Sequence, residues 1–211
     1  MCGRYTLSSP PKTLTAWFEL SEPPAALTPR YNIAPTQAVL VVANHGPRTL
    51  QLMRWGLVPH WANASSVGNR MINARAETLH TKPAFRDPLR SRRCLIPANG
   101  FYEWRREADG SKTPILIRSR SQQPLGLAGL WDEWRAPNGT PLRSCTIVTT
   151  QPNAIIAPIH DRMPVILARD DYAQWLTSDE IPPDELMRLL APAPDGGLET
   201  HPVARLVNEL A

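Results

Sequence analysis

The chain has 211 residues, 42% of them hydrophobic, and a formal net charge of +4. This composition predicts a folded globular protein and excludes a disordered chain. The 23 prolines, roughly twice the usual frequency, exclude an all-helical bundle because proline interrupts helices. The three cysteines show no CxxC spacing, which argues against a disulfide scaffold and a thiolate metal site. The positive charge suits a polyanionic partner, although a solvated basic face explains it equally well.

The first third of the chain predicts a helix, a strand hairpin, a long polar loop and a second helix. Ser9 is the expected N-cap of the first helix. The two strands flank a turn of Asn, His, Gly and Pro residues. In chain order, the helix is predicted over residues 9–20, the strands over 38–43 and 49–55, the loop over 56–72 and the second helix over 73–79.

The rest of the chain is predicted to be rich in strands, with two short helices near the end. Asn138-Gly139 is a strong hairpin signal between two of the strands. The strands are predicted over residues 93–105, 115–118, 125–134, 143–149, 164–168 and 202–207, and the helices over 170–176 and 183–190. This order predicts a single α+β domain over residues 1–211 with mainly antiparallel sheet and short peripheral helices.

No secretory or membrane-spanning segment is visible in the sequence. The apolar region of a signal peptide is missing after Arg4, and the apolar run Ala38–Ala43 is far too short to span a bilayer. We therefore expect a cytoplasmic protein without a membrane partner, which would be nucleoid-associated when it binds DNA.

The chain begins Met1-Cys2-Gly3, and removal of Met1 would leave an α-amine and a thiol on one residue. The α-amine has a reference pKa of about 7.7–8.0, against about 10.4 for lysine, so a useful fraction is neutral at pH 7. Such an amine condenses with an aldehyde to a Schiff base. The neighbouring thiol can then add to the imine and close a thiazolidine ring. An internal cysteine cannot form this ring because it lacks the free amine.

Two other interpretations of Cys2 stay open at this level. It can be an ordinary second residue, or the thiol nucleophile of a cysteine peptidase or self-processing N-terminal nucleophile hydrolase. Cys94 and Cys145 lie in apolar, strand-like segments and are expected to be buried and inert.

Seven short motifs, in order along nearly the whole chain, together resemble the SOS response-associated peptidase (SRAP) family. They are Cys2–Tyr5, Tyr31–Thr36, Trp55–Trp61, Ile72–Thr78, Cys94–Trp104, Ile159–Pro164 and His201–Val203. The resemblance implies an α+β domain with a barrel-like β core. It also implies covalent capture of abasic sites in single-stranded DNA, although the family is named for a peptidase activity.

The resemblance also assigns residues, motif by motif. The implied catalytic residues are Cys2, Asn73, Glu103 and His160. The implied DNA-contacting residues are Arg4, Asn32, Pro35, Trp61, Arg75 and Arg162. Trp61 is followed by Ala62, where the family often has a more aromatic wedge between bases. Binding is expected to depend strongly on salt and little on sequence, since an abasic site has no base to read.

The residue types suit imine chemistry. A carboxylate such as Glu103 can take a proton from the Cys2 amine, and the imidazole of His160 can assist sugar ring opening and proton transfer at C1′. The amide of Asn73 can hold the substrate or the amine. Each also has a structural interpretation: an outward strand residue for Glu103, a structural histidine for His160 and a helix cap for Asn73. Asp161 is a candidate for orienting His160, although strand alternation would point it elsewhere.

These observations lead to one main hypothesis with alternatives. The protein is expected to be a monomer that shields abasic sites during the DNA damage response, with AP-lyase activity as a side reaction. The alternatives are the peptidase, perhaps limited to Met1 removal, and a non-catalytic DNA-binding module. The remaining histidines show no ligand spacing, so neither a metal nor another cofactor is expected.

Overall fold

The computed structural model describes residues 2–24, 26–177 and 179–209. The strands are β1 (Arg4–Leu7), β2 (Arg30–Ile33), β3 (Ala38–Ala43), β4 (Leu50–Trp55), β5 (Asn73–Arg75), β6 (Arg93–Ala98), β7 (Gly100–Arg106), β8 (Lys112–Ser119), β9 (Leu125–Arg135), β10 (Pro141–Thr150), β11 (Met163–Pro164), β12 (Ile166–Leu167) and β13 (Leu198–Pro202). The α-helices are α1 (Pro11–Phe18), α2 (Pro83–Ser91), α3 (Tyr172–Trp175) and α4 (Pro183–Leu189). Short 3-10 helices are η1 (Ser65–Arg70), η2 (Ala76–Thr78), η3 (Arg169–Asp171), η4 (Asp195–Gly197) and η5 (Arg205–Asn208).

A closed barrel forms the centre of the molecule. Its strands follow the order β10-β4-β3-β6-β9, and β9 pairs again with β10, which closes the circle. The pairings around it are antiparallel except for β4 with β10. All six residues of β6 are buried, as expected for a strand covered on both faces.

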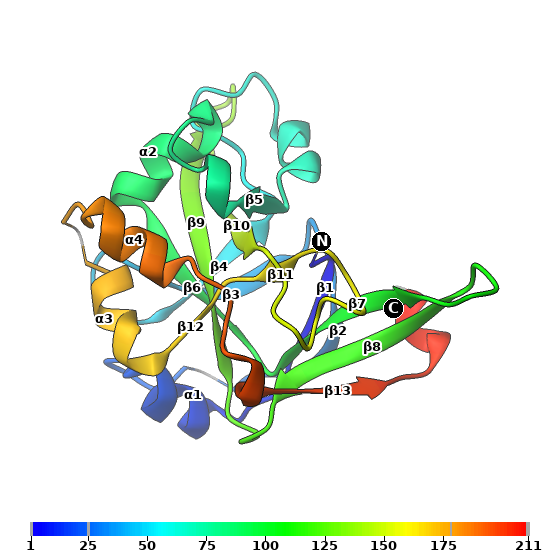
Figure 1. The fold of residues 1–211 in the computed structure, drawn as a ribbon. Helices are drawn as coiled ribbons and strands as arrows, with labels where there is room; N and C mark the ends of the chain where they lie inside the picture. Colours follow the sequence, from blue (N-terminus) through cyan, green and yellow to red (C-terminus); the bar gives the residue numbers. More distant parts are fainter. Residues whose placement is uncertain (1, 25, 178, 210–211) are drawn as a thin grey trace.

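A second sheet, with the antiparallel order β13-β8-β7-β1-β2, extends from one side of the barrel. Figure 1 shows its β7–β8 hairpin projecting away from the barrel, with β1 between that hairpin and β2. Tyr5 of β1 links the sheet to the barrel, because its ring packs edge-on against Trp55 of β4 with centroids 5.3 Å apart. The N-terminal strand therefore lies where the two sheets meet.

The helices lie at the periphery (Figure 1). In α1, Leu14 and Phe18 fall on one face and are both buried, and the helix ends where Glu19 adopts a left-handed conformation at φ 52°. The α3 region is held to the barrel through the buried side chain of Arg93. Its guanidinium donates hydrogen bonds to the carbonyl oxygens of Trp175 and Thr177.

The structure confirms the predicted α+β class, with its mainly antiparallel barrel-like core and short peripheral helices. The Asn138-Gly139 hairpin is also confirmed, since the Thr140 amide donates to the Asn138 side chain and Gly139 has a φ of 83°. Cys94 and Cys145 are buried as predicted. Among the described residues, no helix combines the length and apolar character that crossing a bilayer requires.

Some local predictions were wrong. Residues 73–79 do not begin a helix: Asn73 starts β5, which pairs in parallel with the distant β10, and only a short 3-10 turn follows. The expected strand at 202–207 is instead a strand that ends at Pro202 followed by η5. Ser9 does not cap α1, since its hydroxyl accepts a hydrogen bond from Asn99. Three missed elements, β1, β2 and α2, are short or contain an internal proline.

Candidate active site

Cys2 lies fully buried just before β1. Its thiol is 4.0 Å from the carbonyl oxygen of Arg4, to which it donates a weak hydrogen bond. Burial, assisted by the negative charge of Glu103, raises the pKa of the thiol well above its usual range. The thiol is therefore protonated at neutral pH.

Asn73 binds the backbone of Cys2 directly. Its Nδ2 donates a 2.8 Å hydrogen bond to the Cys2 carbonyl oxygen. The parallel pairing of Asn73 with Ile147 of β10 fixes this position, and the indole of Trp55 donates to the neighbouring Ile72 carbonyl at 2.9 Å. The other amide atom, Oδ1, is buried and accepts no hydrogen bond from the described residues. It is an acceptor available to a donor that enters the site.

Glu103 and His160 complete the cluster. Glu103 lies in β7, two residues beyond Phe101, which pairs with Tyr5 of β1. Its carboxylate is buried, and Oε2 lies 3.8 Å from Nε2 of His160. His160 ends the turn after β10, where its backbone amide donates to the Ile156 carbonyl at 2.9 Å. Residues 2, 73, 103 and 160 thus lie together in one cluster.

The ring of His160 has a defined orientation. Its Nδ1 lies 3.0 Å from the backbone N–H of Arg162 and 2.9 Å from the exposed carboxylate of Asp161. The first contact requires a lone pair on Nδ1, whereas the second requires a proton there. Arg162 therefore favours the neutral ring with its proton on Nε2, and Asp161 favours the charged ring. Contrary to strand alternation, Asp161 does reach His160.

Burial shifts the pKa values of the two acid–base groups in opposite directions. It raises the pKa of Glu103 from 4.5 to about 7, and the negative charge of Asp161 acts in the same direction. Burial lowers the pKa of His160, with Asp161 opposing that change. Glu103 can therefore exchange a proton near neutral pH, which is the condition for general acid–base catalysis.

Arg4 and Asn32 lie on the outer side of the second sheet and are tied to one another. Arg4 Nη1 donates to Asn32 Oδ1 at 2.8 Å and to the Val207 carbonyl at 2.6 Å. Pro35 is half-buried in the turn between β2 and β3. Arg4 and Asn32, both predicted to contact DNA, thus lie together, and both donate hydrogen bonds to the C-terminal region of the chain itself.

Arg75 and Arg162 each lie two residues after a member of the cluster, Asn73 and His160, but differ in their contacts. Arg75 is exposed at the end of β5. Arg162 is nearly buried and forms a bidentate pair with Glu77 at 2.8 and 2.9 Å, and it also donates to the Thr149 carbonyl. This pair holds the pKa of the Glu77 carboxyl below its usual value. Of these two arginines, therefore, only Arg75 has a side chain that is directly accessible to a ligand.

Trp61 is 53% exposed, as expected of a residue that stacks on bases, whereas Trp55 is fully buried. The loop that carries Trp61 is fixed at several points. The buried carboxylate of Asp132 accepts the His60 backbone N–H at 2.9 Å and lies 3.1 Å from the His60 ring, and the Trp134 indole donates to the Ala62 carbonyl. The ring of Trp61 is thus presented on a rigid support.

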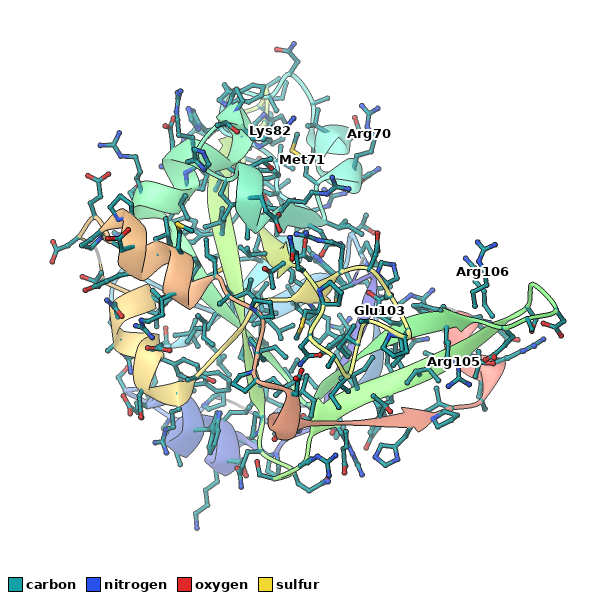
Figure 2. The ribbon with its side chains drawn as sticks, in the orientation of Figure 1. Arg70, Met71, Lys82, Glu103, Arg105 and Arg106 are labelled. Carbon is teal, nitrogen blue, oxygen red and sulfur yellow. The ribbon has the colours of Figure 1, made fainter. Side chains whose placement is uncertain are left out.

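Sequence reasoning did not single out two further exposed arginines, Arg70 and Arg106. Figure 2 shows Arg70 on the η1 region and Arg106 further along the projecting hairpin that also carries Glu103. Their only sequence signal is proximity to the Ile72–Thr78 and Cys94–Trp104 motifs. Nowhere in the described ranges do three His, Cys, Asp or Glu side chains gather in a way that could hold a metal ion.

The fold and the site define a class of protein: a closed β-barrel that holds a cysteine near its N-terminus against an asparagine, a glutamate and a histidine. The chain belongs to the SOS response associated peptidase (SRAP) family, whose model matches residues 1–210. It is 44% identical to the abasic site processing protein YoqW of Bacillus subtilis, over 99% of this chain and 94% of that protein.

Similarity extends to animal proteins and to solved structures. The abasic site processing protein HMCES of Gallus gallus is 33% identical, over 86% of this chain and 63% of its own length. A crystal structure of a protein from Bacteroides thetaiotaomicron superimposes with a TM-score of 0.89 at 24% identity, covering 97% of this chain and 93% of the other. That structure shows the shared fold.

Proposed function

We propose that this protein processes abasic sites in DNA by capturing them covalently, in single strands, through Cys2 after Met1 has been removed. The observation that carries the proposal is the meeting of Cys2, Asn73, Glu103 and His160 in one buried cluster. The abasic site processing function of the relatives points to the same substrate.

The first step would be Schiff-base formation. The neutral α-amine of Cys2 attacks C1′ of the ring-opened sugar, and Glu103 accepts one proton from the nitrogen and passes it to the C1′ oxygen, which gives a carbinolamine. The carbinolamine loses its hydroxyl as water, with a proton supplied from Nε2 by the imidazolium form of His160, the form that Asp161 favours. The remaining proton of the nitrogen returns to His160, so that a C=N bond replaces the C=O bond, water leaves and no electrons are gained or lost.

The second step would close the ring. The Cys2 sulfur adds to C1′ of the imine, the thiol proton leaves through Glu103, and the nitrogen gains one proton. A thiazolidine results, without any further leaving group. The raised pKa of the buried thiol fits this order, because a protonated thiol waits until the electrophilic imine has formed. Asn73 would hold the Cys2 backbone in place throughout.

The same property argues against the peptidase alternative. A cysteine peptidase needs a thiolate, and such sites lower the pKa of the thiol with a positive charge or a helix N-terminus. Here burial and Glu103 raise it. If the thiol does not close the ring, β-elimination from the Schiff base would give AP-lyase activity, so Cys2→Ser should favour strand cleavage over a stable adduct.

The decisive experiment mixes the protein with a single-stranded oligonucleotide that holds one abasic site. We expect an adduct that survives denaturation, whose N-terminal peptide has the mass of a Cys2 thiazolidine without Met1. Cys2→Ala should abolish it, whereas Cys145→Ala, at another buried cysteine, should not. An unchanged adduct yield in Cys2→Ala would refute the mechanism, and intact mass of both proteins controls for Met1 removal.

A further inference from the structure

A C-terminal segment occupies the outer face of the second sheet. Arg4 and Tyr102 are register partners in β1 and β7, and Trp104 lies two residues further along β7, so the three side chains share a face. The η5 segment lies against this part of the sheet, beside β8, and is drawn in red near the C-terminal label in Figure 1. We use the name tail for residues 205–209.

The tail is held mainly through its backbone oxygens. The Val207 carbonyl accepts hydrogen bonds from Arg4 at 2.6 Å and from Asn32 Nδ2 at 3.1 Å, and the Glu209 carbonyl accepts a second one from Asn32 at 2.7 Å. The indole of Trp104 donates to Asn208 Oδ1 at 2.8 Å. The tail thus offers a row of oxygen acceptors to donors on the sheet.

These contacts are of a kind that a phosphodiester would replace with stronger ones. Arg4 donates to neutral oxygens of Asn32 and Val207, and no acidic side chain among the described residues forms an ion pair with it. A hydrogen bond from a guanidinium to a charged oxygen is roughly twice as strong as a neutral one. A phosphate at Arg4 would also form an ion pair with the guanidinium, whose positive charge the neutral oxygens of Asn32 and Val207 do not neutralise.

The tail itself is lightly attached. None of the η5 residues is buried, and Leu206 is 72% exposed. The side chains of the tail itself therefore bury little apolar surface, and they contribute little hydrophobic free energy to its attachment. A segment that contributes hydrogen bonds but almost no core can leave the sheet without unfolding it.

We propose that the tail is a removable occupant of a phosphate-binding surface formed by Arg4 and Asn32, so that single-stranded DNA and the tail compete for it. This inference rests on the proposed function for the identity of the ligand. As a consequence, the docked tail weakens binding of undamaged single strands, compared with a chain in which Arg4 and Asn32 are free to contact DNA. Contacts at the lesion itself then contribute a larger share of the affinity, which favours damaged DNA.

The test compares three proteins: the full chain, a chain that lacks residues 205–211, and a chain of full length in which residues 205–209 are glycine and serine. Binding is measured with an undamaged single-stranded oligonucleotide, which requires no covalent step. The deleted chain should bind about three- to tenfold more tightly, because removing a docked state that competes with DNA raises the apparent affinity by the inverse of the fraction of molecules in which the tail is undocked. The glycine–serine chain keeps the backbone oxygens but loses the Asn208 contact and gains flexibility, so its affinity should rise by a smaller factor. The glycine–serine chain guards against an effect of length alone.

A double-mutant cycle locates the effect. Arg4→Ala should weaken binding in the tail-deleted chain and remove most of the gain from deletion, whereas Lys12→Ala on α1 should leave that gain intact. Amide hydrogen exchange of residues 205–209 in the full chain should accelerate when DNA binds. Equal or weaker DNA binding by both tail variants, or tail amides that stay as protected with DNA bound, would overturn the proposal.

Failure of this inference can be separated from failure of the proposed function. If adducts form but both tail variants bind undamaged DNA no better than the full chain, competition by the tail is refuted and covalent capture of abasic sites is supported. If no protein forms an adduct while the tail variants bind more tightly, the capture is wrong and the competition stands.

Discussion

The candidate catalytic cluster and the residues predicted to contact DNA are built in contrasting ways. Asn73 and Glu103 hold their positions through strand register, and Cys2 and Glu103 are almost completely removed from solvent. Of the arginines predicted to contact DNA, Arg75 is exposed, whereas Arg162 is held by Glu77 and Arg4 by the tail. The chemistry is thus preorganised, whereas the binding surface is adjustable. Changes in the cluster should affect rate steeply, and changes outside it should shift affinity modestly.

The strongest challenge to this contrast is Glu103→Gln, which removes the proposed base. We expect the rate of adduct formation to fall by about 10²- to 10⁴-fold, the usual contribution of general acid–base catalysis. The ratio of wild-type to variant rates should rise with pH below about 7, where Glu103 ionises, and level off above it. Single-turnover kinetics between pH 5 and 9 measures this ratio, and Glu107→Gln, an acid on the same hairpin, is the control. A ratio independent of pH would remove Glu103 from the role of base.

Stability offers a second view of the same carboxylate. In the folded protein burial raises the pKa of Glu103 from 4.5 to about 7, so the folded state holds its proton more tightly than the unfolded state. That stabilisation is fully present below about pH 4.5 and is lost as the pH rises through about 7. Relative to wild type, Glu103→Gln should therefore gain up to about 3 kcal/mol in unfolding free energy between these limits. Urea denaturation at pH 4.5 and pH 8 measures the difference. If the unfolding free energies of variant and wild type differ by the same amount at both pH values, burial does not raise the pKa of Glu103.

Substitution of Trp61 tests whether a rigidly held side chain outside the cluster also contributes to DNA binding. Stacking on one base is worth about 1–3 kcal/mol, so Trp61→Ala should weaken binding of single-stranded DNA by roughly tenfold or more. Trp61→Phe should recover most of the loss, because a ring remains on the fixed loop. Fluorescence anisotropy with a labelled oligonucleotide measures both. If the two variants are equally impaired, the indole is not acting as a stacking surface.

The smallest effects are expected among the charges. Arg75→Ala should reduce the dependence of log affinity on log salt by about 0.7, which corresponds to one phosphate contact on a single strand. Lys12→Ala, far from the site, removes the same charge as a control. Glu77→Gln should instead tighten binding by about two- to fivefold, since it frees Arg162 to meet a phosphate. Weaker DNA binding by Glu77→Gln would show that the ion pair with Glu77 holds Arg162 in position to bind DNA and does not keep it away from the phosphates.

Sequence patterns predicted the parts of this fold that are local. The hairpin at Asn138-Gly139 depends on two residues, and the strands on either side are long and apolar, so the prediction was correct. The segment that begins at Asn73 was predicted wrongly because a polar residue before a short polar run is typical of a helix start. Its strand conformation depends on pairing with Ile147, 74 residues away, which no local pattern encodes.

The candidate site shows the same division. The residue types of Cys2, Glu103 and His160 indicated imine chemistry, and the family motifs indicated that they belong together. Neither source could predict that Arg162 pairs with Glu77, or that Arg4 meets a carbonyl oxygen 203 residues away. Those contacts depend on how the sheets and loops meet in three dimensions, and they determine which predicted DNA contacts are available.

The closure of the barrel has a consequence for when the protein becomes reactive. Cys2 meets a side chain 71 residues away, and the cluster also needs β1 to pair with the distant β7, where Arg4 lies opposite Tyr102. Folds dominated by such distant contacts form slowly, because loop closure comes before the stabilising contacts. A nascent chain thus carries Cys2 long before its acid–base partners exist. In the proposed mechanism, acid–base assistance to Cys2 therefore arises only once the chain has folded, and a protein that unfolds loses that assistance in the same step.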